Sequence, residues 1–186
     1  MRAKTDLSKY TIGNYSTGSG PIKRLLWYFV NVLFFINPMC PVSRLKVFLL
    51  RLFGARVGKG VIIKPAVNIK YPWKLSIGDH CWIGERAWID NLAEVSIGPN
   101  CCISQGAMLL CGNHNFKLET FDLITGPVQL EEGVWIGAHS IVCPGVSCHS
   151  HSVLAVNSVA TKNLEAYHIY QGNPAVKTKE RVIESK

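Results

Sequence analysis

The tetrad Cys111-Gly112-Asn113-His114 holds the side chain best placed for acid–base chemistry in this chain. An imidazole titrates near neutral pH, so a histidine in a fixed position can take a proton from a hydroxyl group. The tetrad stands where a regular pattern stops, at the root of a segment, about residues 112–127, that we expect to project as a loop. Loops on rigid scaffolds often carry function. We therefore predict that His114 is a general base, against the alternative of an exposed loop histidine without a role.

The other histidines and the cysteines offer weaker chemistry. We interpret the remaining histidines as surface residues: His80, His139, His149, His151 and His168. A metal needs ligands that converge on one point, and no histidine pairs with His114 at a suitable spacing. No two of the seven cysteines have metal-finger spacing, and we interpret them as reduced packing residues of a cytosolic protein. We expect no metal.

The pattern that stops at the tetrad is an apolar residue at every sixth position. The seventeen positions are Val57, Ile63, Ile69, Leu75, Ile77, Ile83, Ile89, Val95, Ile97, Ile103, Leu109, Leu130, Ile136, Val142, Cys148, Leu154 and Ala160. A period of six fits neither a helix nor simple strand alternation, and it predicts an all-β solenoid with three sides. Three hexads make one turn, and the restarts at Ile77 and Ile97 add two residues each, which gives turns of 20 residues.

Composition and charge narrow the classes of partner. The chain has 186 residues, 48% of them hydrophobic and 17% charged, which fits one compact domain with appendages. Its net charge of +8 is concentrated in the first seventy residues. Such charge suits an anionic membrane surface or a phosphate-bearing substrate. We expect no nucleic-acid partner, because no recognised binding motif accompanies the basic residues.

The N-terminal third differs from the repeat region. We expect residues 1–21 to be a polar, flexible lead, followed by an apolar helical segment from Leu25 to Ile36 and an amphipathic one from Val42 to Phe53. Twelve apolar residues are too few to span a bilayer, which needs about 20. The segments either cap the open end of the solenoid or lie on the inner leaflet of a membrane. The predicted divisions are residues 1–55 for the lead and helices, 56–164 for the solenoid, and 165–186 for a C-terminal tail.

Several motifs resemble one known family. The C-terminal signature lies in residues 134–146, 157–162 and 172–175, and upstream matches lie in residues 51–58, 71–75 and 103–107. Together they are similar to hexapeptide-repeat acyltransferases, and within these to the colanic-acid-type (WcaF-like) sugar O-acetyltransferases. The resemblance implies a left-handed parallel β-helix and a cytoplasmic enzyme that uses acetyl-CoA. It also implies a homotrimer with active sites between adjacent subunits.

The resemblance also implies roles for individual residues. His114 matches the catalytic base, the backbone N–H of Ala138 matches the donor to the oxyanion, and Trp135 matches a residue that lines the tunnel between donor and acceptor. The remaining matches lie along the expected CoA path: Val156, Asn157, Thr161, Lys162 and Lys179. Asn157 stands where the family more often has glycine.

The acceptor is less well defined. Asp90, Asn91 and Asn113 could hydrogen-bond sugar hydroxyls, although Asp and Asn serve equally well in turns. We expect acetyl transfer to a sugar hydroxyl in surface or exopolysaccharide biosynthesis. Lipid-linked, nucleotide-linked and free sugars remain open as acceptors, as do serine and an amino sugar.

Two other classes use the same scaffold. A γ-type carbonic anhydrase would bind zinc through three histidines, which this chain does not supply around His114. A non-catalytic trimeric scaffold would act through the basic N-terminal helices, and the presence of His114 and Trp135 argues against it.

Overall fold

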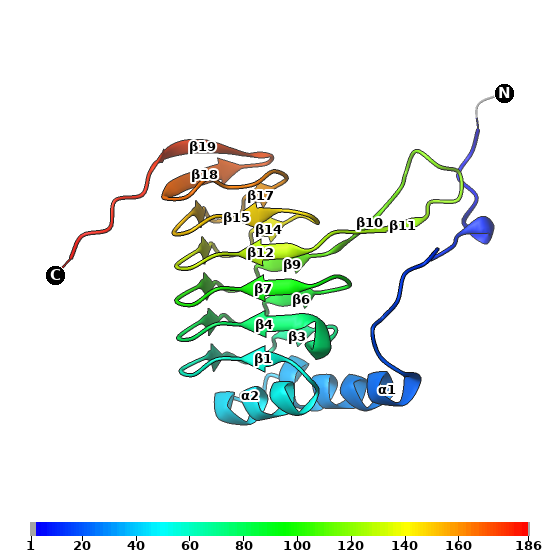
Figure 1. Ribbon diagram of the computed structural model, residues 1–186, viewed down its shortest axis with the longest axis horizontal. Helices are drawn as coiled ribbons and strands as arrows, with labels where there is room; N and C mark the ends of the chain where they lie inside the picture. Colours follow the sequence, from blue (N-terminus) through cyan, green and yellow to red (C-terminus); the bar gives the residue numbers. More distant parts are fainter. Residues whose placement is uncertain (1–2, 186) are drawn as a thin grey trace.

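The computed structural model describes residues 3–185 and shows a parallel β-solenoid on a helical base (Figure 1). Its short strands stack into three sheets, here named walls A, B and C, which the chain visits in that order on each turn. Wall A consists of β1 (Arg56–Val57), β4 (Leu75–Ile77), β7 (Val95–Ile97), β12 (Val128–Leu130) and β15 (Ser147–Cys148). The prediction of an all-β solenoid with three sides is confirmed.

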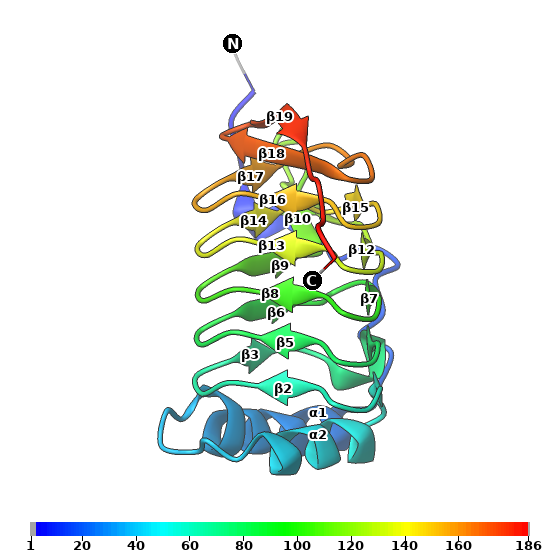
Figure 2. The ribbon, with the colours of Figure 1, turned by 90° about the vertical axis from the view of Figure 1, so that its left-hand side faces the viewer.

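Walls B and C complete the triangle. Wall B consists of β2 (Ile62–Ile63), β5 (Trp82–Ile83), β8 (Cys102–Ile103), β13 (Trp135–Ile136), β16 (Val153–Leu154), β18 (His168–Gly172) and β19 (Ala175–Glu180). Wall C consists of β3 (Asn68–Ile69), β6 (Trp88–Asp90), β9 (Met108–Leu110), β14 (Ile141–Val142) and β17 (Val159–Ala160). Figure 2 faces wall B, whose strands lie one above another.

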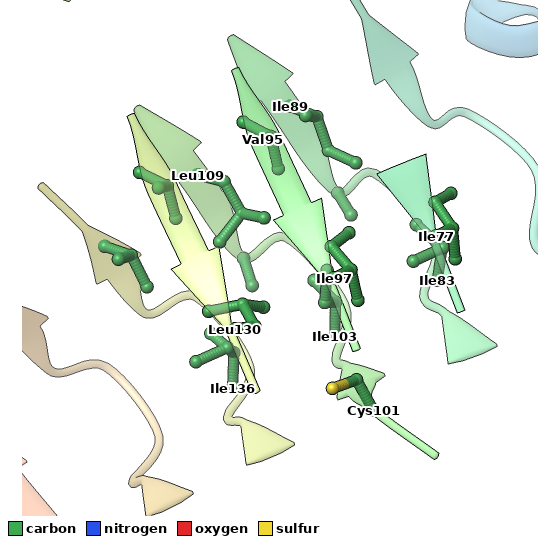
Figure 3. Packing of buried hydrophobic residues seen from close by; sticks show 14 of the residues in the cluster. Ile77, Ile83, Ile89, Val95, Ile97, Cys101, Ile103, Leu109, Leu130 and Ile136 are labelled. Atoms are coloured by element: carbon green, nitrogen blue, oxygen red, sulfur yellow. The ribbon is translucent and has the colours of Figure 1, made fainter. Parts of the chain in front are cut away.

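The predicted apolar positions form the core. All of them are buried except Val57, which is half-buried on the first rung beside the helices. Figure 3 shows how these side chains fill the space between the walls. The two extra residues per turn lie in wall A, where Leu75 and Ile77 of one strand both point inward and pair in register with Val95 and Ile97. Side chains two apart share a face of a strand, so the insertion keeps the phase.

The cysteines pack as expected. All seven are free thiols, and Cys81, Cys101, Cys111 and Cys148 are buried. Burial raises the pKa of the Cys148 thiol to about 12, so the group stays protonated and unreactive at neutral pH.

The helices cover the first turn of the solenoid. They are α1 (Pro21–Val30), the π-helical η2 (Asn31–Ile36) and α2 (Ser43–Leu52). Trp27 is buried against the first rung, and its indole N–H donates to the carbonyl of Ile69 over 2.9 Å. Lys46 is buried as well, with its ammonium bonded to the carbonyl of Lys64 over 2.7 Å. Of the two alternatives, capping describes the inward face of these segments. Within residues 3–185, no helix is long and apolar enough to cross a membrane.

The predicted flexible lead is instead an extended arm. Residues 3–20, with the 3₁₀ turn η1 (Leu7–Lys9), run from the base along the side of the solenoid to the projecting loop (Figure 1). The indole of Trp73, in the 3₁₀ turn η3 (Pro72–Lys74), donates to the carbonyl of Thr17 over 2.7 Å. The Tyr15 hydroxyl donates to the carbonyl of Leu92. The expectation was wrong because these partners are more than fifty residues away in the sequence.

The predicted C-terminal tail is also regular structure. β18 pairs in parallel with β16 and extends wall B, and β19 folds back antiparallel on β18. The solenoid wall therefore continues past residue 164, because β18 satisfies the free edge of the last wall B strand.

Candidate active site

The loop after Leu109 is a β-hairpin that leaves the solenoid at the corner between walls C and A. β10 (Gly112–His114) pairs antiparallel with β11 (Leu123–Thr125), so His114 lies opposite Leu123. The N–H of Gly126 donates to the carbonyl of Cys111 over 2.9 Å and closes the neck of the hairpin. The projection predicted for residues 112–127 is confirmed, and its root is held by strand pairing.

The imidazole of His114 is fixed by one residue of the same hairpin. Its Nδ1 lies 2.9 Å from the carbonyl oxygen of Phe121, and its ring stacks on the Phe121 ring with centroids 4.5 Å apart and planes within 10°. A carbonyl oxygen only accepts, so Nδ1 carries the proton and Nε2 presents its lone pair. Phe121 has a left-handed backbone, with φ of 53°, which is uncommon for a bulky residue. Such conformations concentrate at functional sites.

The N-terminal arm completes the surroundings of His114. Leu7 and Tyr10 line a cavity of about 340 Å³ together with His114 and Phe121, and the Tyr10 ring centroid lies 5.8 Å from that of His114. Lys9 and Glu119 form an ion pair of 3.0 Å between the arm and the hairpin. Sequence analysis missed Leu7 and Tyr10, since no pattern in the sequence links the arm to a segment more than a hundred residues away.

Asp90 lies directly beneath the root of the hairpin. A Cβ on Gly112 would come within 2.5 Å of Leu92 Cδ1 and 3.8 Å of Asp90 Oδ2, so a side chain here would require the end of Leu92 to move. The carboxylate forms an ion pair of 3.0 Å with Lys70 on the rung below. Asp90, Lys70 and Trp88 line one side of a cavity of about 590 Å³ that is closed on the other side by α1 and η2.

The two asparagines have different surroundings. Asn91 is fully buried, and its side-chain oxygen accepts from the N–H of Tyr71 over 2.9 Å while its amide donates back to the carbonyl of Tyr71. It therefore holds the corner between two turns. Asn113 is exposed beside the base, and its side-chain oxygen accepts from the N–H of His114.

Three of the residues expected on the CoA path lie at the corner between walls B and C: Ala138, Val156 and Asn157. Trp135, on wall B, is 46% exposed, and its indole donates to the Ser104 hydroxyl over 2.9 Å. Ala138 is half-buried at the next corner, and the exposed Val156 lies one rung above it. Among the described residues the N–H of Ala138 has no hydrogen-bond partner, but the same holds for Glu85 and Gln105 at equivalent corners.

Asn157 occupies the same corner with a left-handed backbone. Its φ is 56°, and its N–H donates to the carbonyl of Ala138 over 2.9 Å. Asparagine is among the residues that tolerate this conformation best, which explains how it can stand in place of glycine. Thr161 and Lys162 follow at the exposed end of wall C, whereas Lys179 lies on wall B in β19. The two lysines thus lie on different sides of the solenoid.

His114 and the corner between walls B and C lie on different sides of one chain. The hairpin leaves the corner between walls C and A, which is opposite wall B in a triangular solenoid. Figures 1 and 2 show the hairpin pointing away from the face that carries β13. A single chain therefore does not bring His114 and Trp135 together.

The outer surfaces of the three walls differ in polarity. In wall B the outward positions stack in register as Ile62, Trp82, Cys102, Trp135, Val153 and Ile169. In wall C they are Asn68, Trp88, Met108, Ile141 and Val159. In wall A they are Arg56, Ser76, Ser96, Gln129 and Ser147. Two walls thus present apolar columns, and one presents a polar column.

Comparison with known proteins assigns the family. Over 177 residues the chain is 37% identical to WcaF of Escherichia coli K12, whose name places it in colanic acid biosynthesis as an acetyltransferase; the match covers 95% of this chain and 97% of WcaF. The chain belongs to the hexapeptide-repeat acetyltransferase family. A model of this family, the hexapeptide repeat of succinyl-transferase, matches residues 74–111.

More distant members of the hexapeptide-repeat acetyltransferase family agree with this assignment. The galactoside O-acetyltransferase of Escherichia coli K12 is 27% identical over 123 residues, which cover 64% of this chain and 61% of that protein. The crystal structure of a hexapeptide-repeat acetyltransferase from Vibrio cholerae with acetyl-CoA has a TM-score of 0.80 at 21% identity, and covers 90% of this chain and 93% of that one. It shows the same fold.

The metal alternative gains no support from the geometry. Within residues 3–185, no three side chains of His, Cys, Asp or Glu come together as metal ligands would.

Proposed function

We propose that the protein transfers the acetyl group of acetyl-CoA directly to a hydroxyl of a sugar, with Nε2 of His114 as the general base. The observation that carries this proposal is the hydrogen bond between His114 Nδ1 and the carbonyl of Phe121. In the neutral ring this bond puts the proton on Nδ1 and leaves the lone pair on Nε2, and the stacked Phe121 ring holds the imidazole in one orientation. A base must be neutral and fixed before it can take a proton as a bond forms.

The proton and the electron pairs can be followed through one step. Nε2 takes the proton of the sugar hydroxyl while its oxygen attacks the thioester carbonyl carbon. The new C–O bond forms, and the tetrahedral intermediate carries negative charge on the former carbonyl oxygen. Its collapse breaks the C–S bond, and the leaving thiolate takes the proton back from the imidazolium. The products are the acetyl ester and CoA, and His114 is neutral again.

Two features support direct transfer. The thiol nearest the base in sequence, Cys111, is fully buried, and burial raises its pKa to about 11, so it is a poor nucleophile for an acyl-enzyme. The unpaired N–H of Ala138 is a suitable donor to the oxyanion. We assign Trp135, Val156, Asn157, Thr161, Lys162 and Lys179 to the acetyl-CoA site.

We propose further that the active site forms between two copies of the chain in a homotrimer. His114 of one copy would face Trp135 and Ala138 of the next, because one chain holds them on different sides. The apolar columns of walls B and C suit a contact between two different faces, the kind that closes into a ring. The polar column of wall A suits the solvent-facing side.

For the acceptor we propose a saccharide of a surface or exopolysaccharide pathway, acetylated in the cytoplasm at the inner face of the membrane. The name of the WcaF relative supports the pathway. Asp90 and the exposed Asn113 flank the root of the hairpin and would hydrogen-bond the sugar. We leave Asn91 out of this site because Tyr71 occupies its amide.

The acceptor class is tested by a panel assay. Purified protein and acetyl-CoA are incubated with free sugars, nucleotide sugars, lipid-linked saccharides, amino sugars and serine, and thiol release is followed together with the mass of the acceptor. We expect a gain of one acetyl group on a sugar oxygen. Acetylation of an amine or of serine instead would reject the sugar O-acetyltransferase, and the His114→Ala variant supplies the blank.

A further inference from the structure

The helical base has one face that packs inward and one that nothing covers. Trp27 and Phe35 are buried against the first rung, as a cap requires. The opposite face carries an outer stripe, which we define as Ile22, Leu26, Phe29 and Leu33. Each residue of the outer stripe is more than half exposed, and Ile22 reaches 75%. Capping accounts for the inner face alone.

The apolar surface continues onto the neighbouring elements. Met39, in the link between η2 and α2, is 84% exposed, and Phe48 and Leu52 of α2 are at least 60% exposed. Figures 1 and 2 show α1 and α2 beneath the first turn of the solenoid, so the helical base forms one end of the molecule. Large exposed apolar patches mark interaction sites.

The helices and the segment of sequence that contains them carry charge of a single sign. The sequence contains no Asp or Glu between Asp6 and Asp79, and eleven Lys and Arg residues lie in that interval. Arg24 of α1 and Arg44 of α2 make no ion pair within the described part of the chain. Arg44 also lines a cavity of about 690 Å³ beside Phe48 and Lys59, at the edge of the base. Asp79 and Asp90 lie at the border of this surface, where Asp79 accepts from the N–H of Lys59 and Asp90 pairs with Lys70. The helices themselves present only cations to an anion.

We infer that the helical base, which consists of α1, η2 and α2, is a docking surface for an anionic membrane. Helices that lie in a bilayer interface combine an apolar face, flanking Lys and Arg, and aromatic side chains, and α1 with η2 and α2 has all three. The outer stripe enters the boundary between head groups and acyl chains, while Arg24 and Arg44 contact lipid phosphates. Cyclic symmetry places equivalent surfaces at the same end of an assembly, so a trimer presents three bases to one membrane.

Docking has a consequence for the acceptor, and this step rests on the proposed acetyl transfer. The root of the hairpin at Gly112 lies two rungs above β3, or roughly 10 Å at the usual spacing of strands. The cavity that contains Asp90 lies between that root and the base. A docked protein therefore holds its catalytic hairpin within reach of a saccharide carried on a membrane lipid.

Vesicle flotation tests the docking surface without any assay of activity. Full-length protein is mixed with vesicles of phosphatidylcholine alone or of equal parts phosphatidylcholine and phosphatidylglycerol, and the bound fraction is measured on a density gradient. We expect binding to the anionic vesicles that weakens with added salt. Protein that stays at the bottom of both gradients, or that floats equally with both vesicles, would overturn the inference.

Matched variants locate the contact. We expect Leu26→Ser with Phe29→Ser to weaken vesicle binding about tenfold or more. Val182→Ser with Ile183→Ser removes two exposed apolar side chains away from the base and should leave it unchanged. Unchanged binding of the first pair would reject the outer stripe. Thermal unfolding of each variant shows whether the cap is intact.

A second pair separates charge from apolar contact. Arg24→Gln with Arg44→Gln should weaken binding roughly fivefold per cation, because each juxtamembrane cation contributes about that much. Lys4→Gln with Lys117→Gln, one in the N-terminal arm and one in the hairpin between β10 and β11, should have no effect. The His114→Ala variant should float like the wild type. Loss of acetyl transfer with intact flotation in this variant thus separates the two proposals. If the Arg24/Arg44 and Lys4/Lys117 variants float equally, the proposed contact of Arg24 and Arg44 with lipid phosphates is contradicted.

Discussion

The hairpin that carries His114 and wall B follow different construction rules. Wall B repeats one rule, in which an inward residue packs in the core and its outward neighbour stacks on the rung below, so Trp82, Cys102 and Trp135 form a column. The hairpin has no repeat, and its one reactive side chain is fixed by the carbonyl and ring of Phe121. A repeated surface suits a long ligand such as CoA, whereas a base needs a single irregular position.

The difference explains why one chain would not suffice. The core of the solenoid separates the corner between walls C and A, where His114 lies, from wall B, where Trp135 lies. A change of side-chain rotamers therefore cannot bring the two residues of one chain together. In the proposed trimer, a neighbouring copy supplies the missing half. Assembly and catalysis would then depend on the same contact.

The largest expected effect is at the hairpin. His114→Ala should lower kcat by about 10² to 10⁴-fold, the usual contribution of a general base, with acetyl-CoA binding and assembly unchanged. The measurement is thiol release, with calorimetric binding of acetyl-CoA beside it. His80→Asn is the control, because His80 is an exposed corner residue with φ of 57°, which asparagine also adopts. An alanine variant within a few-fold of the wild type would remove His114 from the mechanism.

Mixing two inactive or weakened chains tests the division between the hairpin and wall B. His114→Ala chains and Trp135→Ala chains, unfolded together and refolded, should regain activity above either variant alone when acetyl-CoA is kept well below its KM. If the base and the tryptophan come from neighbouring copies, about a quarter of the sites in a random trimer combine two intact residues. No regain, with mixed assemblies shown by native mass spectrometry, would place both residues in the site of one chain.

Wall B by itself should show a position-dependent effect. Trp135→Ala should raise the KM for acetyl-CoA about tenfold with a smaller change in kcat, since it removes a contact made before the chemical step. Trp82→Ala removes an indole two rungs below, which is 59% exposed against 46% for Trp135, and should change KM far less. Steady-state kinetics on variants with verified assembly gives the comparison. Equal effects of the two substitutions would deny Trp135 a special role.

The smallest effects concern the arm that packs on the hairpin. Tyr10→Ala should lower kcat a few-fold, because the Tyr10 ring lies against His114 and limits its movement. Lys9→Gln, which removes an exposed ion pair with Glu119, should have less effect still. Amide hydrogen exchange of residues 112–125 should increase in both variants. Lys4→Gln removes a neighbouring cation that has no ion pair among the described residues, and faster exchange in that control would disconnect the effect from the arm.

The sequence predicted those parts of the fold that obey a local rule. One small region, such as Leu75 to Ile83, already contains the alternation and the hexad step, and repetition carries them through the core. His114 could be recognised from the sequence because the six-residue apolar repeat stops beside it. The roles assigned to Trp135 and Ala138 came from resemblance to a family, and they stay predictions.

The parts that the sequence did not predict depend on contacts between distant segments. The arm was expected to be flexible because glycines and polar residues interrupt it, yet Trp73, Leu92 and Glu119 supply partners for its backbone and side chains. We expected a C-terminal tail outside the solenoid after residue 164, but β18 pairs with the open edge of β16 and extends wall B. Asn91 was considered an acceptor residue, and only the neighbouring turn shows that Tyr71 occupies it.

The sequence by itself determined the solenoid, its core positions and the one place where the repeat is broken, because apolar spacing is a property of a short stretch of chain. Only the tertiary structure decided which wall each residue faces, how the Phe121 carbonyl sets the tautomer of His114, and that the base and the proposed CoA site lie on different sides. The physical reason is distance along the chain. Local spacing determines which side chains of one rung point into the core. Contacts between segments that are distant in the sequence depend instead on how all the rungs stack.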